Sequence, residues 1–427
     1  MPHASTTPID PHEPTEAARV VSFWAMTATQ FLGAFNDNLF KQLVLLLAVV
    51  SAAGGESVDR QSLAAGVFAL PFILFSGFGG FLSDRISKRR IIVFCKMAEI
   101  VVMLLAATAF YSGASLELLL GVLFCMGMQS AFFGPAKYGV LPEMVRPRNL
   151  PPANGVIQMT TFVAIIFGTA GAGRLKEWLG DDLWIAGVMC VGVAIAGTIT
   201  SLLIRPIPAA EPKLKFSPSA LLIRRDTWSM LRGDRSLMGA LLVSSLFWLV
   251  GGLILPAINA LGMRVLEVGD ARTSFLAAFL GGGIAVGCVV AGVISRGRVS
   301  FGMMRLGCAG VIIASGLIAI THADGSHWLG FDSSRWVLVA LGASAGLFAV
   351  PLQVFLQARP PEGQKGRMIG AMNLLNWIAI LLSAAVYQVC VVLAEQFSLS
   401  STVTFAVAAV LFVPVLLFYR PKSDALA

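Results

Sequence analysis

The chain has 427 residues, of which 57% are hydrophobic and only 13% are charged, and its mean hydropathy is +0.81. Soluble domains carry about 25% charged residues, so this composition excludes the ordinary soluble classes and indicates a membrane protein. The 43 glycines fit that class, because small residues let membrane helices pack closely.

Residues 1–21 are polar and lack the basic start and short apolar core of a cleaved signal, so we expect a cytoplasmic tail. A membrane-spanning helix needs about 20 mostly apolar residues. Twelve stretches meet this requirement: 22–50, 61–82, 91–112, 116–140, 152–173, 183–204, 237–260, 273–295, 301–321, 335–357, 368–393 and 399–419.

The connections between these stretches are short, except for the Pro-containing, basic segment 205–236. The sequence therefore predicts an all-α membrane protein with two six-helix bundles, residues 22–204 and 237–419. Segment 205–236 would form a cytoplasmic central loop and 420–427 a cytoplasmic tail.

The distribution of Lys and Arg sets the predicted orientation, because cytoplasmic loops are enriched in both. With both termini in the cytoplasm, 22 of the 31 Lys and Arg residues lie on the cytoplasmic side, six on the opposite side and three inside helices. The net charge of +8 is thus explained by topology, and we expect no nucleic-acid partner. Six plus six helices around a basic loop is the architecture of a major facilitator transporter, whose substrate site lies near the midplane between the halves.

Residues 80–90, GFLSDRISKRR, follow the second predicted helix and resemble the signature loop of that superfamily. Gly80 would allow close helix approach and Asp84 would pair with a base on a neighbouring helix. Arg85 and Arg89 would hold the loop on the cytoplasmic side. The alternative, a plain basic loop, would not account for Gly80 and Asp84 at this spacing. The equivalent stretch 292–305 has no Asp.

Residues 30–42, QFLGAFNDNLFKQ, place polar groups inside an apolar helix. At 100° per residue, Gln30, Asp37 and Lys41 share one face, flanked by Asn36 and Asn38. A charge at the bilayer centre costs about 2.5–3.5 kcal/mol even on the lenient insertion scale, so these residues should face a partner or a wet cavity. The alternative is an ion pair between Asp37 and Lys41 that neutralises itself.

Other polar residues inside the predicted helices extend this pattern. Lys96 and Glu99 stand at pairing distance along one helix. The remaining candidates for substrate binding are Lys137, Tyr138, Asn154, Gln158, Gln353, Asn373 and Asn376. The first half holds the charges and the second half mainly amides.

Three stretches, QFLGAFNDNLFKQ (30–42), FFGPAKYGVLPEM (132–144) and ANGVIQMTTFVAIIFGTAGAG (153–173), resemble the bacterial lysophospholipid transporter family. KMAEI (96–100) is similar to its branch fused to a lipid acyltransferase, and SLFW (245–248) and VPLQVFLQ (350–357) match more loosely. The resemblance implies a transporter of the bacterial inner membrane that flips lysophospholipid, chiefly lysophosphatidylethanolamine, to the inner leaflet for re-acylation.

The resemblance further implies that Asp37 and Asn38 contact the headgroup and that Lys137 contacts the phosphate. The family also carries an Arg in the region that here reads LVGGLILP (249–256), and an acid where Asn376 stands. We expect no fused acyltransferase domain after residue 427, so a separate acyltransferase on the cytoplasmic side is a candidate partner. Another amphipathic or small substrate is the alternative function. We expect no enzyme activity, cofactor, metal site or disulfide. The acyl chain is expected to lie against the second half at 276–287, where Gly282 would line the wall.

Overall fold

The computed structural model describes residues 15–51, 57–295, 297–322 and 327–421. The tail residues 1–14 and 422–427, which the sequence analysis assigned to the cytoplasm, lie outside the described residues.

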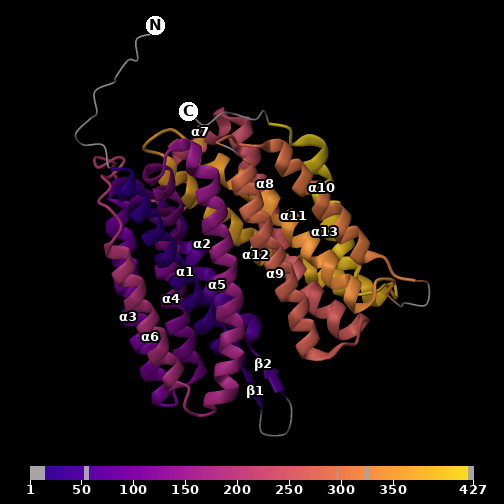
Figure 1. The fold of residues 1–427 in the computed structure, drawn as a ribbon. Helices are drawn as coiled ribbons and strands as arrows, with labels where there is room; N and C mark the ends of the chain where they lie inside the picture. Colours follow the sequence, from indigo (N-terminus) through magenta and orange to yellow (C-terminus); the bar gives the residue numbers. More distant parts are fainter. Residues whose placement is uncertain (1–14, 52–56, 296, 323–326, 422–427) are drawn as a thin grey trace.

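Long apolar helices make up almost all of the described chain (Figure 1). The first half contains α1 (Glu16–Leu47), α2 (Gln61–Arg85), α3 (Lys88–Tyr111), α4 (Leu116–Met144), α5 (Leu150–Leu179) and α6 (Trp184–Leu202). The second half contains α8 (Arg235–Ala260), α9 (Gly269–Ile294), α10 (Phe301–Ala319), α11 (Gly330–Ala358), α12 (Lys365–Gln396) and α13 (Val403–Phe418). The predicted all-α fold in two six-helix halves is confirmed.

Ten helical segments in the described part of the chain are long and apolar enough to cross a membrane. The two remaining long helices of the bundles are α1, which carries the polar stretch 36–41, and α13, which has 16 residues. Both pack against other helices of their own half. The polar residues of α1 are therefore surrounded by neighbouring helices.

Two small elements were not predicted. The central loop contains α7 (Arg225–Gly233), a nine-residue helix whose charged residues include Asp226. A short antiparallel hairpin of β1 (Val49–Ser51) and β2 (Ser57–Asp59) follows α1. Helix α1 also begins at Glu16, earlier than the predicted start at 22.

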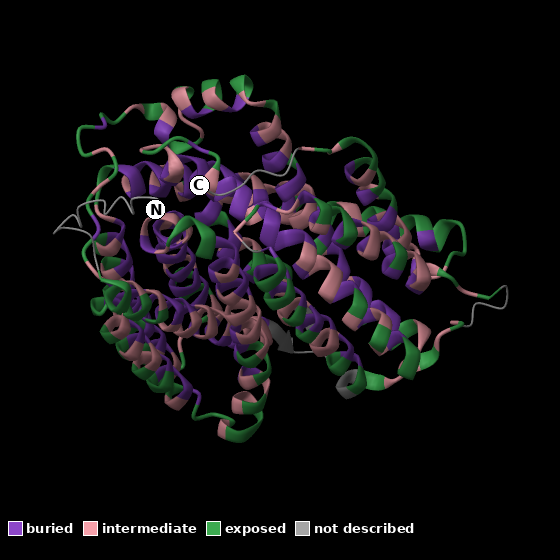
Figure 2. Cartoon of the chain, turned by 45° about the horizontal axis from the view of Figure 1, so that its top comes forward, coloured by how far each residue is buried: buried purple, intermediate pink, exposed green. Residues whose placement is uncertain are grey.

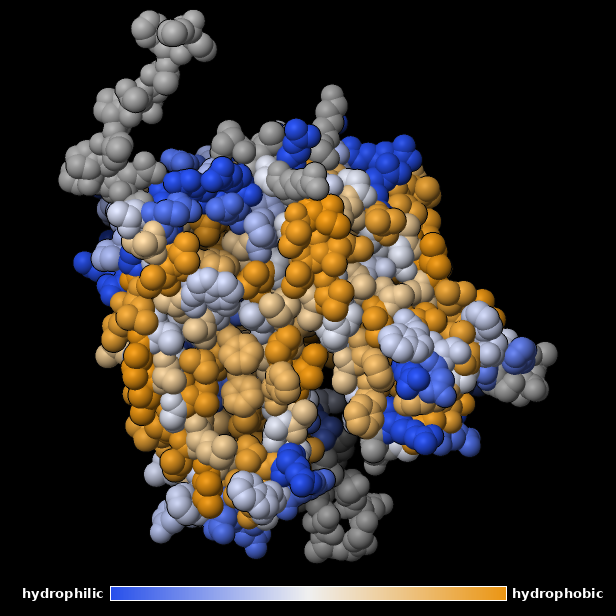
Figure 3. All heavy atoms as spheres, in the orientation of Figure 1, coloured by the Kyte–Doolittle hydropathy of each residue, from blue (hydrophilic) through white to orange (hydrophobic). Residues whose placement is uncertain are grey.

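Each half has its own apolar core. Phe40, Met103 and Leu123 are fully buried in the first half, and Leu338 and Phe348 in the second. The second core extends into the first half at Leu141, Leu150 and Ile157. Buried residues follow the helix faces that point inward (Figure 2), while apolar side chains cover the middle of the face seen in Figure 3. Such a surface is what a hydrocarbon solvent favours.

The two halves meet through α2 against α12 and α5 against α9. The twelve long helices run up and down in turn, and an even number of passages returns the chain to the end where it began. The start of α1 and the end of α13 therefore lie at the same end of the molecule, here called the terminal end (Figure 1). The bundles diverge toward the opposite, open end, and the space-filling view is hollowed between them there (Figure 3).

Candidate functional site

Asp37 lies on α1 and faces α4. Its carboxylate accepts a hydrogen bond from Ser130 Oγ (2.5 Å) and a longer one from Gln129 Nε2 (3.3 Å). Asp37 is only half-buried. Two neutral donors from α4 thus hold the acid, and its negative charge is left for a further partner.

Lys41 does not form the i,i+4 ion pair with Asp37. Its Nζ donates to Asn38 Oδ1 (2.8 Å) and lies 5.2 Å from the centre of the Phe68 ring. Asn38 Nδ2 in turn donates to Ala34 O within α1. The acid and the base therefore turn to different neighbours, and the self-neutralised pair is not the arrangement of this structure.

An aromatic group missed by the sequence analysis lies beside Lys41. Trp377 of α12 stacks on Phe72 of α2, with ring centres 4.1 Å apart, and meets Phe68 edge-on at 5.9 Å. These rings join α2 of the first half to α12 of the second. The helical spacing of Phe68 and Phe72 in α2 can be read from the sequence, but nothing in the sequence indicates that Trp377 of α12 packs against them.

Lys137 is buried between α4, α1 and α5. Its ammonium donates to Gln30 Oε1 (2.9 Å) and Thr161 Oγ1 (3.1 Å) and lies 4.9 Å from the centre of the Tyr138 ring. Gln30 Nε2 also donates to Thr160 Oγ1 (2.6 Å). Only neutral groups bond this cation, so its positive charge remains available for an anion.

Gln30 and Asp37 are seven residues apart on α1, which corresponds to about 10 Å along the helix. The cluster around Lys137 therefore lies about 10 Å nearer the terminal end than the cluster around Asp37. Both are formed by α1 and α4. The structure thus brings the predicted acid and base onto the same pair of helices, two turns apart.

Asn36 is separated from this pair and points toward α3 and α6. Its Nδ2 donates to Glu99 Oε1 (2.8 Å) and to Cys190 O (3.2 Å), and the residue is fully buried. Glu99 also pairs with Lys96 at 2.5 Å, as the spacing predicted. Asn36 therefore supports a buried ion pair inside the first half, and its predicted contact with substrate is not what this structure shows.

Two predicted substrate residues form bonds between the halves. Asn154 on α5 and Gln357 on α11 exchange two amide hydrogen bonds (2.8 and 3.0 Å), and both are fully buried. Asn373 on α12 donates to Ser76 Oγ on α2 (2.8 Å). These amides hold the terminal end closed, and substrate would reach them only if the halves separate.

The remaining amides belong to single halves. Asn376 Oδ1 accepts from Ser244 Oγ (3.1 Å) and Ser245 Oγ (3.4 Å) of α8. Gln158 is buried on α5, one turn beyond Asn154. Gln353 on α11 has a buried Nε2 without a hydrogen-bond partner among the described residues. An unsatisfied buried donor is costly, so Gln353 is the amide of the second half best suited to an additional ligand.

The predicted gate residue Asp84 binds the start of α12 across the interface between the halves. Its carboxylate accepts from Gly366 N (2.7 Å), Arg367 N (3.0 Å) and Arg367 Nε (2.9 Å). Gly80 permits this approach, because a Cβ there would lie 2.7 Å from Gly366 O and 3.0 Å from Gly370 Cα. Arg367 was not found by sequence analysis, since nothing in its local pattern marks it.

The central loop adds two further acids to Arg367. Glu211 and Asp226 bind its guanidinium at 2.6 and 2.5 Å. Burial acts to raise the pKa of Asp226, but the hydrogen bond from Arg224 and the charge of Arg367 outweigh it, so its pKa lies below its ordinary value of 3.8. The linker between the halves thus fastens the closed end.

Arg85 and Arg89 take no part in that contact. Arg85 is exposed and lies 5.8 Å from the centre of the Phe81 ring, and Arg89 donates to Leu202 O (2.9 Å). Lys88, by contrast, is fully buried and pairs with Glu143 at 2.6 Å. The bases of this loop therefore brace the first half and are not the cross-interface partners of Asp84.

Gly282 does not line a wall between the halves, although the sequence analysis expected it to. Gly282 is exposed, and a Cβ at this position would meet open space, on the face of α9 that also exposes Val286 and Val293. Its neighbour Gly281 faces the first half, where a Cβ would meet Ile166 Cδ1. An apolar pocket of about 520 Å³ lies instead between α1, α5 and α6, lined by residues that include Phe31, Phe35, Leu39, Phe167, Leu175 and Met189.

The part of the chain that the structure describes holds no group of three or more His, Cys, Asp or Glu side chains that could bind a metal ion. The candidate site is made of opposite charges, amides and aromatic rings that lie inside the membrane-spanning helices. These groups can bind a polar, charged ligand end and can exchange bonds between the halves.

The family model described as Major Facilitator Superfamily matches residues 23–384. The lysophospholipid transporter LplT of Enterobacter sp. (strain 638) is 28% identical over 379 residues, which cover 86% of this chain and 88% of the relative. That of Serratia proteamaculans (strain 568) is 27% identical over 390 residues, covering 90% and 92%. The sequence-based assignment to this family is thereby confirmed.

Two solved structures show the same fold. The transporter FucP, in the outward conformation, aligns with a TM-score of 0.73 at 13% identity and covers 94% of this chain and 99% of its own. The human organic anion transporter MFSD10 aligns with a TM-score of 0.73 at 16% identity, covering 96% and 100%.

Proposed function

Because this chain belongs to the major facilitator superfamily, we propose that it transports lysophospholipid and flips it from the outer to the inner leaflet of a bacterial inner membrane. The substrate class is supported by the curated relatives, which are named lysophospholipid transporters. A phosphate–ammonium headgroup such as that of lysophosphatidylethanolamine is the preferred ligand.

The observation that carries this proposal is the presence of two opposite charges, Asp37 on α1 and Lys137 on α4, about two helical turns apart. Asp37 is held by two neutral donors and Lys137 by neutral oxygens. A carboxylate suits an ammonium, and a lysine suits a phosphate. Uncompensated charges at membrane depth favour a functional role over a structural one.

The separation of the two clusters suggests successive contacts. Asp37 lies nearer the open end and Lys137 about 10 Å deeper along the helix. A small headgroup entering from the open end would meet Asp37 first and Lys137 later. The acyl chain would stay among apolar side chains, where each buried methylene contributes about 0.8 kcal/mol.

In alternating access, the present open end would then close and the terminal end would open. The terminal end is held by Asp84 with Arg367, by Asn154 with Gln357 and by close glycine contacts. Breaking these bonds would admit the headgroup to the terminal side. The excess of Lys and Arg supports a cytoplasmic location for that side. A separate acyltransferase on that side would re-acylate the product.

The test is uptake of headgroup-labelled lysophosphatidylethanolamine by proteoliposomes containing the purified chain. Label delivered outside should become inaccessible to an impermeant quencher faster than in protein-free vesicles. Equal rates with and without protein would refute the proposal.

The second candidate is carriage of another amphipathic or small molecule. It is favoured by the described second half, where amides such as Asn376 occupy the membrane interior. A carrier of this kind would be inhibited by an uncharged amphiphile as strongly as by a lysophospholipid of equal chain length.

A further inference from the structure

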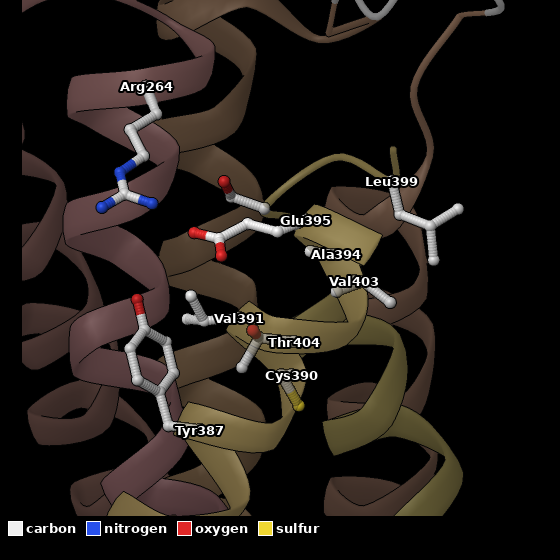
Figure 4. A pocket seen from close by; sticks show the side chains of 10 residues that line it. Arg264, Tyr387, Cys390, Val391, Ala394, Glu395, Leu399, Val403 and Thr404 are labelled. Atoms are coloured by element: carbon white, nitrogen blue, oxygen red, sulfur yellow. The ribbon is translucent and has the colours of Figure 1, made fainter. Parts of the chain in front are cut away.

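A polar pocket lies at the open end of the second half, away from the clusters on α1 and α4. It has a volume of about 90 Å³ and is formed by the turn after α8, the last turns of α12 and the start of α13. Its polar lining residues include Arg264, Tyr387, Glu395, Ser401 and Thr404. Figure 4 shows its charged side chains.

The end of α8 positions Arg264. Helix α8 finishes at Ala260 and continues as a wider turn over Leu261–Val265. This turn directs the Arg264 guanidinium toward α12 (Figure 4). On α12, Tyr387 is held near α8 by its hydroxyl, which donates to Pro256 O (3.4 Å). Glu395 follows eight residues later on the same helix.

Arg264 and Glu395 both point into the gap between their helices (Figure 4). Both are exposed, and neither side chain has a hydrogen bond or an ion pair with any described residue. Other bases at this end are engaged: Arg335 pairs with Asp332, and Arg272 lies over the Phe331 ring. The pocket thus offers one positive and one negative group without a hydrogen bond or ion pair among the described residues, and the Arg264 charge acts on the neighbouring Tyr387 hydroxyl.

A guanidinium and a carboxylate on opposite walls complement a ligand that carries one anion and one cation. The planar guanidinium matches the oxygens of a phosphate, and the carboxylate accepts hydrogen bonds from an ammonium. The volume corresponds to about three water molecules, so the pocket can enclose part of a headgroup while the rest of the headgroup lies at its mouth. The pocket also lies at the open end of α8 and α12, at the depth where lipid headgroups meet a spanning helix.

We propose that this pocket is a surface site for a phosphate–ammonium zwitterion, in which Arg264 binds the phosphate and Glu395 binds the ammonium. The site rests on the proposed function for its ligand, the lysophospholipid headgroup before it enters between the halves. A soluble phosphoethanolamine carries the same chemistry, so the two sources are separated by experiment.

The first arm uses O-phosphoethanolamine and the purified chain in nanodiscs, with broadening of the ³¹P resonance as the measure of binding. Broadening is expected in the wild type and in the double variant Asp37→Asn/Lys137→Ala, in which the cluster on α1 and α4 has lost both charges. In that background it is expected to disappear when Arg264→Ala or Glu395→Gln is added. Arg272→Ala is the matched control at the same end and should retain it. Broadening that persists in that background with either pocket substitution would overturn the site.

The second arm measures lysophospholipid uptake by the same variants in proteoliposomes. Loss of a charged hydrogen bond should raise KM by about tenfold and leave kcat unchanged. Arg264→Ala should raise KM for both lysophosphatidylethanolamine and lysophosphatidylglycerol. Glu395→Gln should raise it only for the former, which carries the ammonium. Unchanged KM values in both variants would overturn the assignment to the lipid headgroup.

The two arms distinguish this inference from the proposed function. If the wild-type chain takes up no lysophospholipid but the ³¹P pattern holds, the proposed function fails and the zwitterion site stands. If uptake is normal and the ³¹P resonance is unaffected by the wild-type chain, the site fails and the proposed function stands.

Discussion

The two halves share one architecture but place their charges at different depths. In the first half, Asp37, Lys96, Glu99 and Lys137 lie inside the membrane-spanning helices. In the described second half, the corresponding depth holds amides such as Asn376, and charges such as Arg264 and Glu395 stand at the open end. Charges at depth are costly, and Lys96 and Glu99 neutralise each other, so we propose that Asp37 and Lys137 make the first half the one that binds a charged group.

The halves also differ in how they are braced. The buried pair of Lys96 and Glu99, with Asn36 bonded to the acid, fixes α1 against α3 within the first half. The amides of the second half are divided between its own α8 and the opposite half. Breaking a buried ion pair leaves an uncompensated charge, so the amide bonds between the halves can be exchanged at lower cost than the contact of Asp84 with Arg367.

The largest effect is expected when the charge of Asp37 in the first half is removed. Asp37→Asn keeps the shape of the side chain and removes its charge, so uptake of lysophosphatidylethanolamine should fall by at least about tenfold, the value of a charged hydrogen bond. Uptake is measured in proteoliposomes with insertion checked by protein recovery. Wild-type uptake in this variant would assign Asp37 a structural role.

Lys137 tests whether the anion is bound in the first half. Lys137→Ala should weaken binding of lysophosphatidylethanolamine by about tenfold, because a charged contact to phosphate is lost. Binding of an uncharged monoacylglycerol of the same chain length should change little. Competition binding in detergent compares the two ligands, and an equal loss for both would indicate that Lys137 maintains the fold.

The close contact between the halves is tested by two glycines of α2. A Cβ at Gly80 would lie 2.7 Å from Gly366 O, whereas a Cβ at Gly66 has open space. Gly80→Ala should destabilise the closed terminal end by about 1–3 kcal/mol through overpacking, and Gly66→Ala should not. Spin labels at Arg85 and Lys365 would report the change as a longer distance. Identical distance distributions in the two variants would contradict the role of Gly80.

The smallest expected effect concerns Asp234, which caps α8. Its carboxylate accepts from Ser236 N, Leu237 N and Arg359 Nε at 3.0, 3.1 and 2.8 Å. Burial acts to raise the pKa of Asp234, but the hydrogen bonds from Arg359 and the backbone outweigh it and hold the pKa below 3.8. Asp234→Ala should therefore lower the free energy of unfolding by about 1 kcal/mol at neutral pH.

The pH dependence has a defined sign. A carboxyl group whose pKa is lower in the folded state stabilises the fold above its unfolded pKa, and this contribution is lost as the pH falls through the folded value. The difference between wild type and Asp234→Ala should accordingly shrink below pH 3.8. Thermal unfolding in detergent measures it. A difference that stays constant as the pH falls below that value would rule out the charged cap.

Much of this organisation could be predicted from the sequence. Apolar length located the helices, and the spacing of Gly80 and Asp84 singled out two residues that lie at the contact between the halves. The partners were not predictable, because Arg367 and Trp377 follow only from how α12 packs on α2. For the same reason, helical spacing placed Asn36 beside Asp37, although the two side chains turn to different helices. Periodicity assigns a residue to a face, and only tertiary packing assigns its neighbour.

The central claim is that the first half recognises the headgroup at membrane depth. It is tested most directly by the ratio of affinities for lysophosphatidylethanolamine and a monoacylglycerol with the same chain, measured for the wild type, Asp37→Asn and Asn376→Ala. If the first half recognises the headgroup, this ratio should fall by about tenfold in Asp37→Asn and stay unchanged in Asn376→Ala. A ratio that falls in Asn376→Ala and not in Asp37→Asn would contradict it.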